Sequence, residues 1–348
     1  MTGSNLPKLG YACAYAPLPL IEAAGFAPKR ILPLGDFPDQ AGRYLHDTLC
    51  PHVKKILDRA ISNDLGDLKG MVFINSCDAM RRCNDAFRRE GIETFFLDLP
   101  VTGGERSIAR YAADMRTLYG DLCELSGLAP DESRLSEKMA EYGELHDLLE
   151  KARTRRDQGS LSAEKFQVLV NTISALPAKD AAAEINRVLG EAPQTPDPKA
   201  VPVYLFGNVF PDPEAFAMIE SCGARVCGED FCTGSRFLAP MQEGEGDAFI
   251  RLSRSILEKP PCARTLDPTR PGGIGQDVLK AASDAGAKGV IAQFLKFCDP
   301  YLARMPLIRE ALKDAGIPLL VLEGDCTQGS IGQSRTRIEA FLEMLKDA

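Results

Sequence analysis

Two kinds of hydrophobic pattern alternate along the first part of the chain. The short apolar runs "KRILPLG" (29–35), "GMVFINS" (70–76) and "IETFFLDLP" (92–100) are typical of buried strands. Between them, "PHVKKILDRAISN" (51–63) and "DAMRRCNDAFRREG" (78–91) have apolar residues at helical spacing. Strands that alternate with helices of this length predict parallel βαβ units.

The strand pattern stops after about residue 115 and returns near residue 200. In between, "ESRLSEKMAEYGELHDLLEKARTRR" and "SAEKFQVLVNTISAL" read as amphipathic helices, and the Pro-rich stretch "GEAPQTPDPKAVP" follows them. The fold class is therefore α/β, with two Rossmann-like parallel-sheet domains bracketing a helical segment. We expect an N-terminal α/β domain (1–115), a helical segment (116–199) and a C-terminal α/β domain (200–348).

The two α/β parts resemble each other in sequence. One has Cys77-Asp78, a helix and then "GIETFFLD"; the other has Cys298-Asp299, a helix and then "GIPLLVLE". We interpret this as a weak internal repeat.

Composition excludes several classes of function. The 348 residues are 45% hydrophobic and 26% charged, which is typical of a globular protein. The net charge of −8 argues against a nucleic-acid partner, because such proteins present a basic surface. No apolar run is long enough to span a membrane, and no secretion signal is recognisable at the N-terminus. We therefore expect a cytoplasmic protein.

Three of the eleven cysteines stand where helices are expected to begin. Cys77 and Cys298 follow predicted strands and precede helices, and Cys50 precedes a proline that suits the first position of a helix. The helix dipole favours a thiolate there, and thiolates bind metals. Because ligands bind at the carboxyl ends of parallel strands, the three thiolates could converge on one cluster between the domains. The alternative is that they are buried thiols that fill the strand ends.

Several stretches, in order along residues 10–345, resemble the 2-hydroxyacyl-CoA dehydratase and benzoyl-CoA reductase family. They include "GYACAYAPLPLIEAAGFAP", "LCPHVKKILDRA", "NSCDAMRR", "GEDFCTGSRF", "KFCDPYLARMPLIREALKDAGIPLLVLEGD" and "GQSRTRIEAFLEML". The resemblance implies an iron–sulfur subunit whose 4Fe–4S cluster is bound by Cys50, Cys77 and Cys298. It also implies passage of a low-potential electron to an acyl-CoA by ketyl radical chemistry, in a lyase or an oxidoreductase.

The resemblance further implies two partners. One is a homologous cluster-bearing subunit in a dimer, and the other is a separate ATP-hydrolysing activase, in keeping with the lack of a Walker-type phosphate loop in this sequence. Relatives tend to have acidic residues after the proline of the "CxYxP" segment, but here no carboxylate precedes Glu22. Either the partner supplies the acid–base group or the reaction is not a dehydration.

Other residues leave alternatives open. Cys13, Cys232 and Cys326 fall at predicted strand ends and could bind a second cubane, as in double-cubane redox proteins that do not act on CoA thioesters. A subunit without a cluster and a zinc protein are further alternatives. We expect Cys222, Cys227 and Cys262 to serve packing. We expect His52 to be a solvated helix residue, although its position two residues after Cys50 also allows a place beside the cluster. Arg236 would meet CoA phosphates or form salt bridges.

Overall fold

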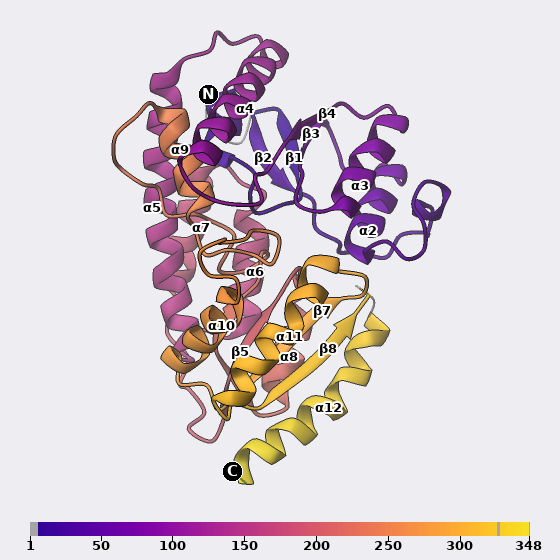
Figure 1. Cartoon of the computed structure of the whole chain (residues 1–348), viewed down its shortest axis with the longest axis vertical. Coiled ribbons are helices and arrows are strands. Elements are labelled where there is room, and N and C mark those ends of the chain that lie inside the picture. The colour runs from indigo at the N-terminus through magenta and orange to yellow at the C-terminus, as the bar shows by residue number, and fades with distance from the viewer. Residues whose placement is uncertain (1–5, 326–327, 348) are drawn as a thin grey trace.

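The chain folds into two α/β halves joined by a column of long helices (Figure 1). The computed structural model describes the backbone of residues 6–325 and 328–347, and the side chains of 6–325 and 334–347. Each half has a four-stranded sheet in which all strand pairs are parallel. The predicted α/β fold with two parallel-sheet domains is thus confirmed.

The N-terminal sheet has the strand order β2-β1-β3-β4. Of the predicted runs, "GMVFINS" forms the central strand β3, whereas "KRILPLG" and "IETFFLDLP" overlap the edge strands β2 and β4. The other central strand, β1, was not predicted; both β1 and β3 are buried along most of their length. Its strands and helices are β1 (Lys8–Tyr11), α1 (Leu18–Ala23), β2 (Ala27–Arg30), η2 (Ala41–Arg43), α2 (Pro51–Ile61), β3 (Leu68–Ile74), α3 (Asp78–Arg89) and β4 (Thr94–Leu97).

The C-terminal sheet has the equivalent order β6-β5-β7-β8, so the internal repeat seen in the sequence extends to the topology. Its elements are β5 (Val201–Gly207), α8 (Pro213–Ser221), β6 (Ala224–Asp230), α9 (Ala248–Leu257), α10 (Gly273–Asp284), β7 (Gly289–Leu295), α11 (Asp299–Asp314), β8 (Leu319–Gly324) and α12 (Gln328–Asp347). In each sheet the strand order reverses between the two central strands: successive strands are added to one side of the first strand and then to its other side. Open α/β sheets bind ligands at this point.

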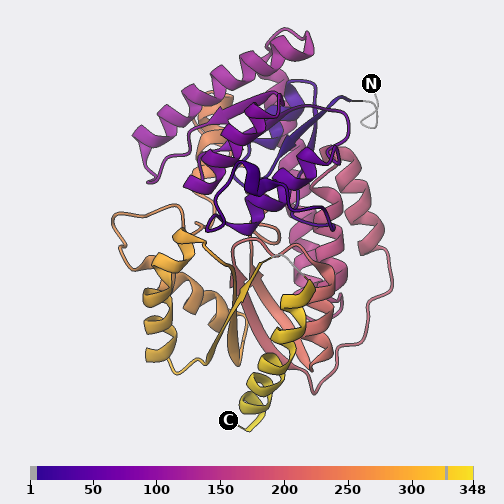
Figure 2. The same ribbon diagram turned by 90° about the vertical axis from the view of Figure 1, so that its right-hand side faces the viewer.

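A helical column lies along one side of both sheets (Figures 1 and 2). It consists of α4 (Glu105–Ser126), α5 (Glu132–Asp157), α6 (Ala163–Ile173) and α7 (Ala178–Leu189). Helix α5 contacts both α1 of the N-terminal half and β6 of the C-terminal half. Residue 115, where we expected the first domain to end, lies within α4; the domain division itself stays a prediction.

Some element boundaries differ from the sequence expectations. The run "KRILPLG" is a strand only as far as Arg30; the N–H of Ile31 still donates to the carbonyl of Tyr11 in β1 at 2.7 Å, and Pro33 has no N–H with which to extend the pairing. Ile31 and Leu32 are nevertheless buried, which explains the strand-like hydrophobicity of the run.

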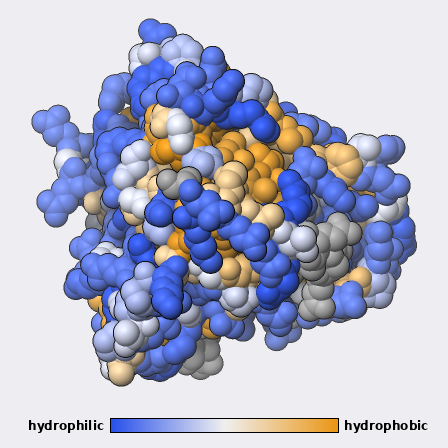
Figure 3. All heavy atoms as spheres, turned by 90° about the horizontal axis from the view of Figure 1, so that it is seen from below, coloured by the Kyte–Doolittle hydropathy of each residue, from blue (hydrophilic) through white to orange (hydrophobic). Residues whose placement is uncertain are grey.

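The exposed surface is mostly hydrophilic. In the view from below, hydrophobic atoms gather in a hollow near the middle of the face, with hydrophilic atoms around them (Figure 3). Within the described residues, none of the helices combines the length and the hydrophobicity needed to cross a bilayer.

Candidate functional site

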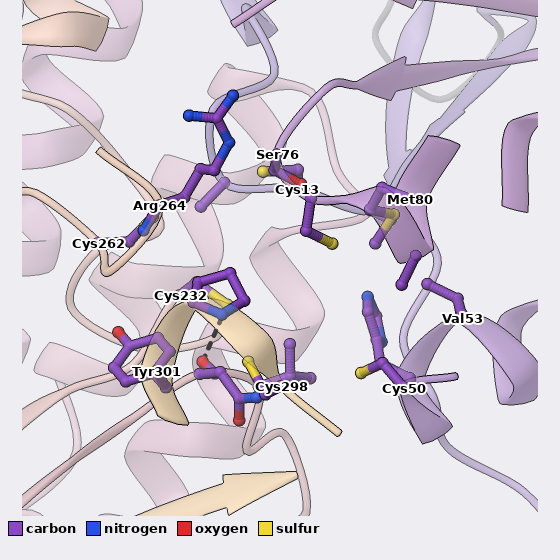
Figure 4. Close-up of a pocket in the computed structure, with 18 of the residues that line it drawn as sticks. Cys13, Cys50, Val53, Ser76, Met80, Cys232, Cys262, Arg264, Cys298 and Tyr301 are labelled. Carbon is purple, nitrogen blue, oxygen red and sulfur yellow. Dashed lines mark hydrogen bonds between the residues drawn. The ribbon is translucent and has the colours of Figure 1, made fainter. Parts of the chain in front are cut away.

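The carboxyl ends of the central strands of both sheets border one cavity of about 400 Å³. The two halves face each other across it (Figure 4). Six cysteines line the cavity: Cys13, Cys50, Cys77, Cys232, Cys262 and Cys298. The first three belong to the N-terminal half and the last three to the C-terminal half, so the cavity wall depends on both sheets.

Cys50, Cys77 and Cys298 all occupy the N-cap positions of helices. Cys50 caps α2 and is followed by proline at the first helical position, Cys77 caps α3 just after β3, and Cys298 caps α11 just after β7. Cys77 and Cys298 are equivalent positions of the repeat, since β3 and β7 occupy the same place in their sheets. The predicted location of these thiols at helix starts is confirmed.

Burial has a larger effect on the pKa values of Cys77 and Cys298 than the backbone N–H groups at the helix starts have. It raises the pKa of Cys77 to about 11, although backbone N–H groups of Met80 and Ala79 act in the opposite direction. Burial likewise raises the pKa of Cys298. The negative charge of an ionised Cys298 contributes to the raised pKa of Cys77, so the two thiols lie within electrostatic reach across the cavity. A thiolate here therefore needs a positively charged partner.

A second group of three thiols lines the other side of the cavity: Cys13, Cys232 and Cys262. Burial raises the pKa of Cys13 to about 11, and the charges of the other two thiols raise it further. The expected third member, Cys326, lies outside the described residues. Cys262 lines this wall, and it also packs against a hydrophobic core, as expected.

Sequence reasoning missed Cys262 because it lies in the irregular segment between α9 and α10. Its Sγ accepts a hydrogen bond from the backbone N–H of Arg264 at 3.3 Å. The same segment pairs with the N-terminal half, where the N–H of Leu266 donates to the carbonyl of Val101 at 2.7 Å. No periodic signal marks a loop whose place is set by such a long-range contact.

Asn208, at the carboxyl end of β5, connects thiols of the two groups. Its carbonyl accepts hydrogen bonds from the N–H of Cys232 at 3.0 Å and from the Sγ of the same residue at 2.9 Å. Its side chain hydrogen-bonds Cys298 and also accepts from the N–H of Leu295 at 3.2 Å. Because β5 is a central strand of its sheet, Asn208 stands at the edge where that sheet borders the cavity.

Three Arg and Lys side chains line the cavity: Arg236, Lys259 and Arg264. Arg236 is buried and forms an ion pair with Asp230 at 3.0 Å, so it is neither a surface salt bridge nor exposed to solvent as a phosphate ligand would be. Lys259 is equally buried, and burial lowers its pKa to about 8. Its Nζ lies 4.5 Å from the centre of the Tyr15 ring.

His52 also lines the cavity and is not the solvated residue we expected. It is only 4% exposed, and neither ring nitrogen has a hydrogen-bond partner among the described residues. Burial lowers the pKa of His52 to about 3, with a smaller contribution from the positive charge of Arg30. The imidazole is therefore neutral at physiological pH.

The carboxylates of the cavity wall are Asp78 and Asp299, which follow Cys77 and Cys298. Glu22 does not line the cavity. It is buried elsewhere, where it pairs with Lys138 at 3.1 Å and accepts a hydrogen bond from the hydroxyl of Tyr142 at 3.2 Å. The first carboxylate after the "CAYAP" segment is therefore structural.

The other four cysteines of the described part of the chain do not line the cavity. Cys83 is fully buried, and its Sγ donates to the carbonyl of Val53 at 3.7 Å. Cys123 and Cys227 are buried, and Cys222 is half-buried at the end of α8. Packing therefore accounts for these four thiols.

No three Cys, His, Asp or Glu side chains among the described residues gather closely enough to hold a single metal ion. That test concerns one ion, whereas the thiolates that hold a cubane bind different irons. The six thiols outnumber the two carboxylates and the one imidazole of the cavity wall, and a donor set dominated by sulfur suits iron–sulfur clusters and soft metals rather than Mg²⁺ or Ca²⁺.

Comparison with known proteins identifies the family. The family model described as 2-hydroxyglutaryl-CoA dehydratase, D-component, matches residues 13–345. The chain is 22% identical to the (R)-phenyllactyl-CoA dehydratase beta subunit of Clostridium sporogenes, covering 99% of this chain and 93% of that one. It is 21% identical to the beta subunit of the lactoyl-CoA dehydratase of Anaerotignum propionicum (97% and 91%) and 22% identical to a benzoyl-CoA reductase subunit of Thauera aromatica (97% and 90%). The chain thus belongs to the 2-hydroxyglutaryl-CoA dehydratase D-component family.

Proposed function

We propose that this chain is the iron–sulfur subunit of an enzyme complex that dehydrates a 2-hydroxyacyl-CoA or reduces an aryl-CoA. The observation that supports this proposal most directly is that Cys50, Cys77 and Cys298 all begin helices and line one cavity between the two sheets. The substrate class rests on the names of the relatives, which are subunits of CoA-thioester dehydratases and of a benzoyl-CoA reductase.

In this proposal the cavity holds a 4Fe–4S cluster bound by these three thiols. The backbone N–H groups at the starts of α3 and α11 face Cys77 and Cys298 and would donate hydrogen bonds to their thiolates. When bound, such a cluster supplies a low-potential electron to the acyl-CoA. The apolar side chains Val53 and Met80 in the wall exclude water, which disfavours additional negative charge and lowers a reduction potential.

We infer that the complex contains a homologous partner subunit and a separate ATP-hydrolysing activase. Several relatives are beta subunits, which implies at least one other subunit in those enzymes. No carboxylate stands between Pro17 and Glu22, and Glu22 is buried against Lys138 outside the cavity, which supports an acid–base group supplied by the partner. Full activity of this chain with its activase alone would contradict the dependence on a partner subunit.

The first test is the iron and acid-labile sulfide content of the chain purified without oxygen. One cubane gives about four of each per chain, and two cubanes give about eight. Cys50→Ala, Cys77→Ala and Cys298→Ala should each lose the broad visible absorbance of the cluster, whereas Cys83→Ala, which removes a buried thiol outside the cavity, should retain it. Zinc without iron, or normal iron in Cys298→Ala, would overturn the proposed ligand set.

The six thiols also favour a second candidate, a double-cubane redox protein that does not act on CoA thioesters. The specific observation is that Cys13, Cys232 and Cys262 line the same cavity as the first three. If this candidate is correct, Cys262→Ser should reduce the iron content from about eight to about four per chain. An unchanged iron content of about four in Cys262→Ser would leave the first proposal and contradict the second.

A further inference from the structure

Two buried cations lie beside the second group of thiols without an acidic partner. Arg30, the last residue of β2, and Lys259, just after α9, each expose only 4% of their surface. Among the described residues, no carboxylate lies within ion-pair distance of either side chain. Buried charges in proteins are normally paired, so these two require an explanation.

Both cations bind the backbone of the segments that contain the cavity thiols. Arg30 donates through Nε to the carbonyl of Ala12 at 3.3 Å and through Nη1 to the carbonyl of Cys232 at 2.7 Å. It thereby joins the segment of Cys13, in the N-terminal half, to Cys232 in the C-terminal half. The second terminal nitrogen of Arg30 is buried without a hydrogen-bond partner.

Lys259 makes an equivalent pair of contacts. Its Nζ donates to the carbonyl of Ala14 at 2.6 Å and to the carbonyl of Arg236 at 3.3 Å. It lines the cavity directly and lies three residues before Cys262. The segments of all three thiols, Cys13, Cys232 and Cys262, are therefore tied together by two positive side chains.

Carbonyl oxygens satisfy the hydrogen bonds of these cations but do not neutralise their charge. Arg236 provides the contrast, since Asp230 pairs with it at 3.0 Å. Two uncompensated charges in a water-poor interior are costly unless an anion occupies the space that they face. A cluster held by thiolates has net negative charge and would provide that compensation.

We propose that Arg30 and Lys259 are positioning residues that hold the loops of Cys13, Cys232 and Cys262 and compensate the negative charge of an iron–sulfur group in the cavity. This inference rests on the proposed function, because it takes the occupant to be an iron–sulfur group. It applies whether the group is one cubane or two, since Lys259 lines the shared cavity and Arg30 binds the carbonyls of Ala12 and Cys232, which line it too.

The test is an anaerobic redox titration of the iron-loaded chain without substrate. Lys259→Gln and Arg30→Gln remove the charge but keep an amide that can donate to a carbonyl, whereas Lys259→Arg keeps the charge. Lys280→Gln, at an exposed position of α10, is the matched control. Loss of a positive charge disfavours the reduced cluster, which carries more negative charge than the oxidised one. At the wild-type midpoint potential, we therefore expect the ratio of reduced to oxidised cluster to fall about tenfold in each Gln variant. This magnitude corresponds to two unit charges ~10 Å apart at an effective dielectric constant of ~20. Lys259→Arg and Lys280→Gln should match the wild type.

A second measurement separates charge compensation from a purely structural role. Iron loading should raise the thermal unfolding temperature of the wild type by more than it raises that of Lys259→Gln, because the variant has lost its attraction to the anionic group. A residue that only ties loops together would lower the unfolding temperature of loaded and iron-free chains equally. That result, or an unchanged ratio of reduced to oxidised cluster in both Gln variants, would overturn the proposed role of Arg30 and Lys259. It would leave the proposed function of the chain untouched. Absence of iron from the wild type would overturn this inference together with the proposed function.

Discussion

Asn208 is the residue whose hydrogen bonds reach both groups of cavity thiols. Its carbonyl accepts from Cys232, and its side-chain oxygen accepts from the buried N–H of Leu295 at the end of β7. A buried N–H that loses its acceptor costs about 1–3 kcal/mol. The geometry of the thiols therefore depends on a side chain that is not itself a proposed ligand.

We predict that Asn208→Leu destabilises the chain by about 1–3 kcal/mol, because Leu has a similar size but cannot accept a hydrogen bond from Leu295. Urea denaturation at neutral pH measures the free energy of unfolding. Asn186→Leu, at an exposed position of α7, controls for the loss of a side-chain amide. Equal stability of Asn208→Leu and the wild type would show that the hydrogen bond contributes nothing.

At the residue scale, sequence patterns found those thiols that stand next to helix starts. Cys50 precedes a proline, and Cys77 and Cys298 follow strands, so local rules of helix capping placed all three. Cys262 and His52 were missed for a different reason. Their burial results from contacts between segments distant in sequence, and no local pattern reports such contacts.

The tight loop that directly follows β6 positions Cys232. Glu229, at 4% exposure, folds back into this loop and accepts hydrogen bonds from the N–H groups of Phe231 at 2.8 Å and Ser235 at 2.7 Å. Arg156 of α5 approaches the same carboxylate at 3.4 Å. The long helix thus supports a loop of the cavity through one buried ion pair.

Gly234 allows this loop to close over the carboxylate. A Cβ atom at position 234 would lie 2.4 Å from an oxygen of Glu229, too close for any real contact. We predict that Gly234→Ala destabilises the chain by about 1–3 kcal/mol, because the carboxylate must leave its backbone donors. Gly120→Ala in the middle of α4 has free space and should instead stabilise the chain by up to about 1 kcal/mol. Thermal unfolding distinguishes the two signs, and a stable Gly234→Ala chain would contradict the proposed crowding.

The buried ion pair should be sensitive to loss of one partner. We predict that Arg156→Met costs about 3–5 kcal/mol, since it leaves the carboxylate of Glu229 buried without its positive neighbour. The double change Arg156→Met with Glu229→Gln should recover part of this loss. A double variant as unstable as the sum of the two single variants would mean that the two residues act independently.

At the element scale, the alternation of strands and helices predicted both sheets and the repeat between them. The helical segment was also recognisable, because α5 and α6 have amphipathic patterns over several turns. Strand ends were less accurate, as β2 shows, since the hydrophobic residues Ile31 and Leu32 just beyond that strand are buried as well. How the two halves face each other depends on long-range contacts that have no periodicity.

On the scale of the whole molecule, the two halves meet beside the cavity through several hydrogen bonds in addition to those of Arg30 and Lys259. The hydroxyls of Tyr15 and Thr265 lie 3.3 Å apart, and the N–H of Leu266 donates to the carbonyl of Val101. A group bound by Cys50 and Cys77 on one side and Cys298 on the other would add covalent links between the halves. Since such a group binds only the folded arrangement, it should stabilise that arrangement in proportion to its affinity.

We therefore predict that removing iron with a chelator and an oxidant, under argon, lowers the urea midpoint of the chain. The same treatment should speed protease cleavage in the segment 258–272, whose Leu266 binds the N-terminal half at Val101. The segment should become accessible because the thiol of Cys262 and its neighbours lose a rigid wall to pack against. Cys298→Ser is the control: it cannot link the halves, so the same treatment should change neither its midpoint nor its cleavage rate. If the stripped wild type resists urea and protease as well as the loaded one does, the cluster does not bridge the two halves, and the ligands would have to be sought within a single half.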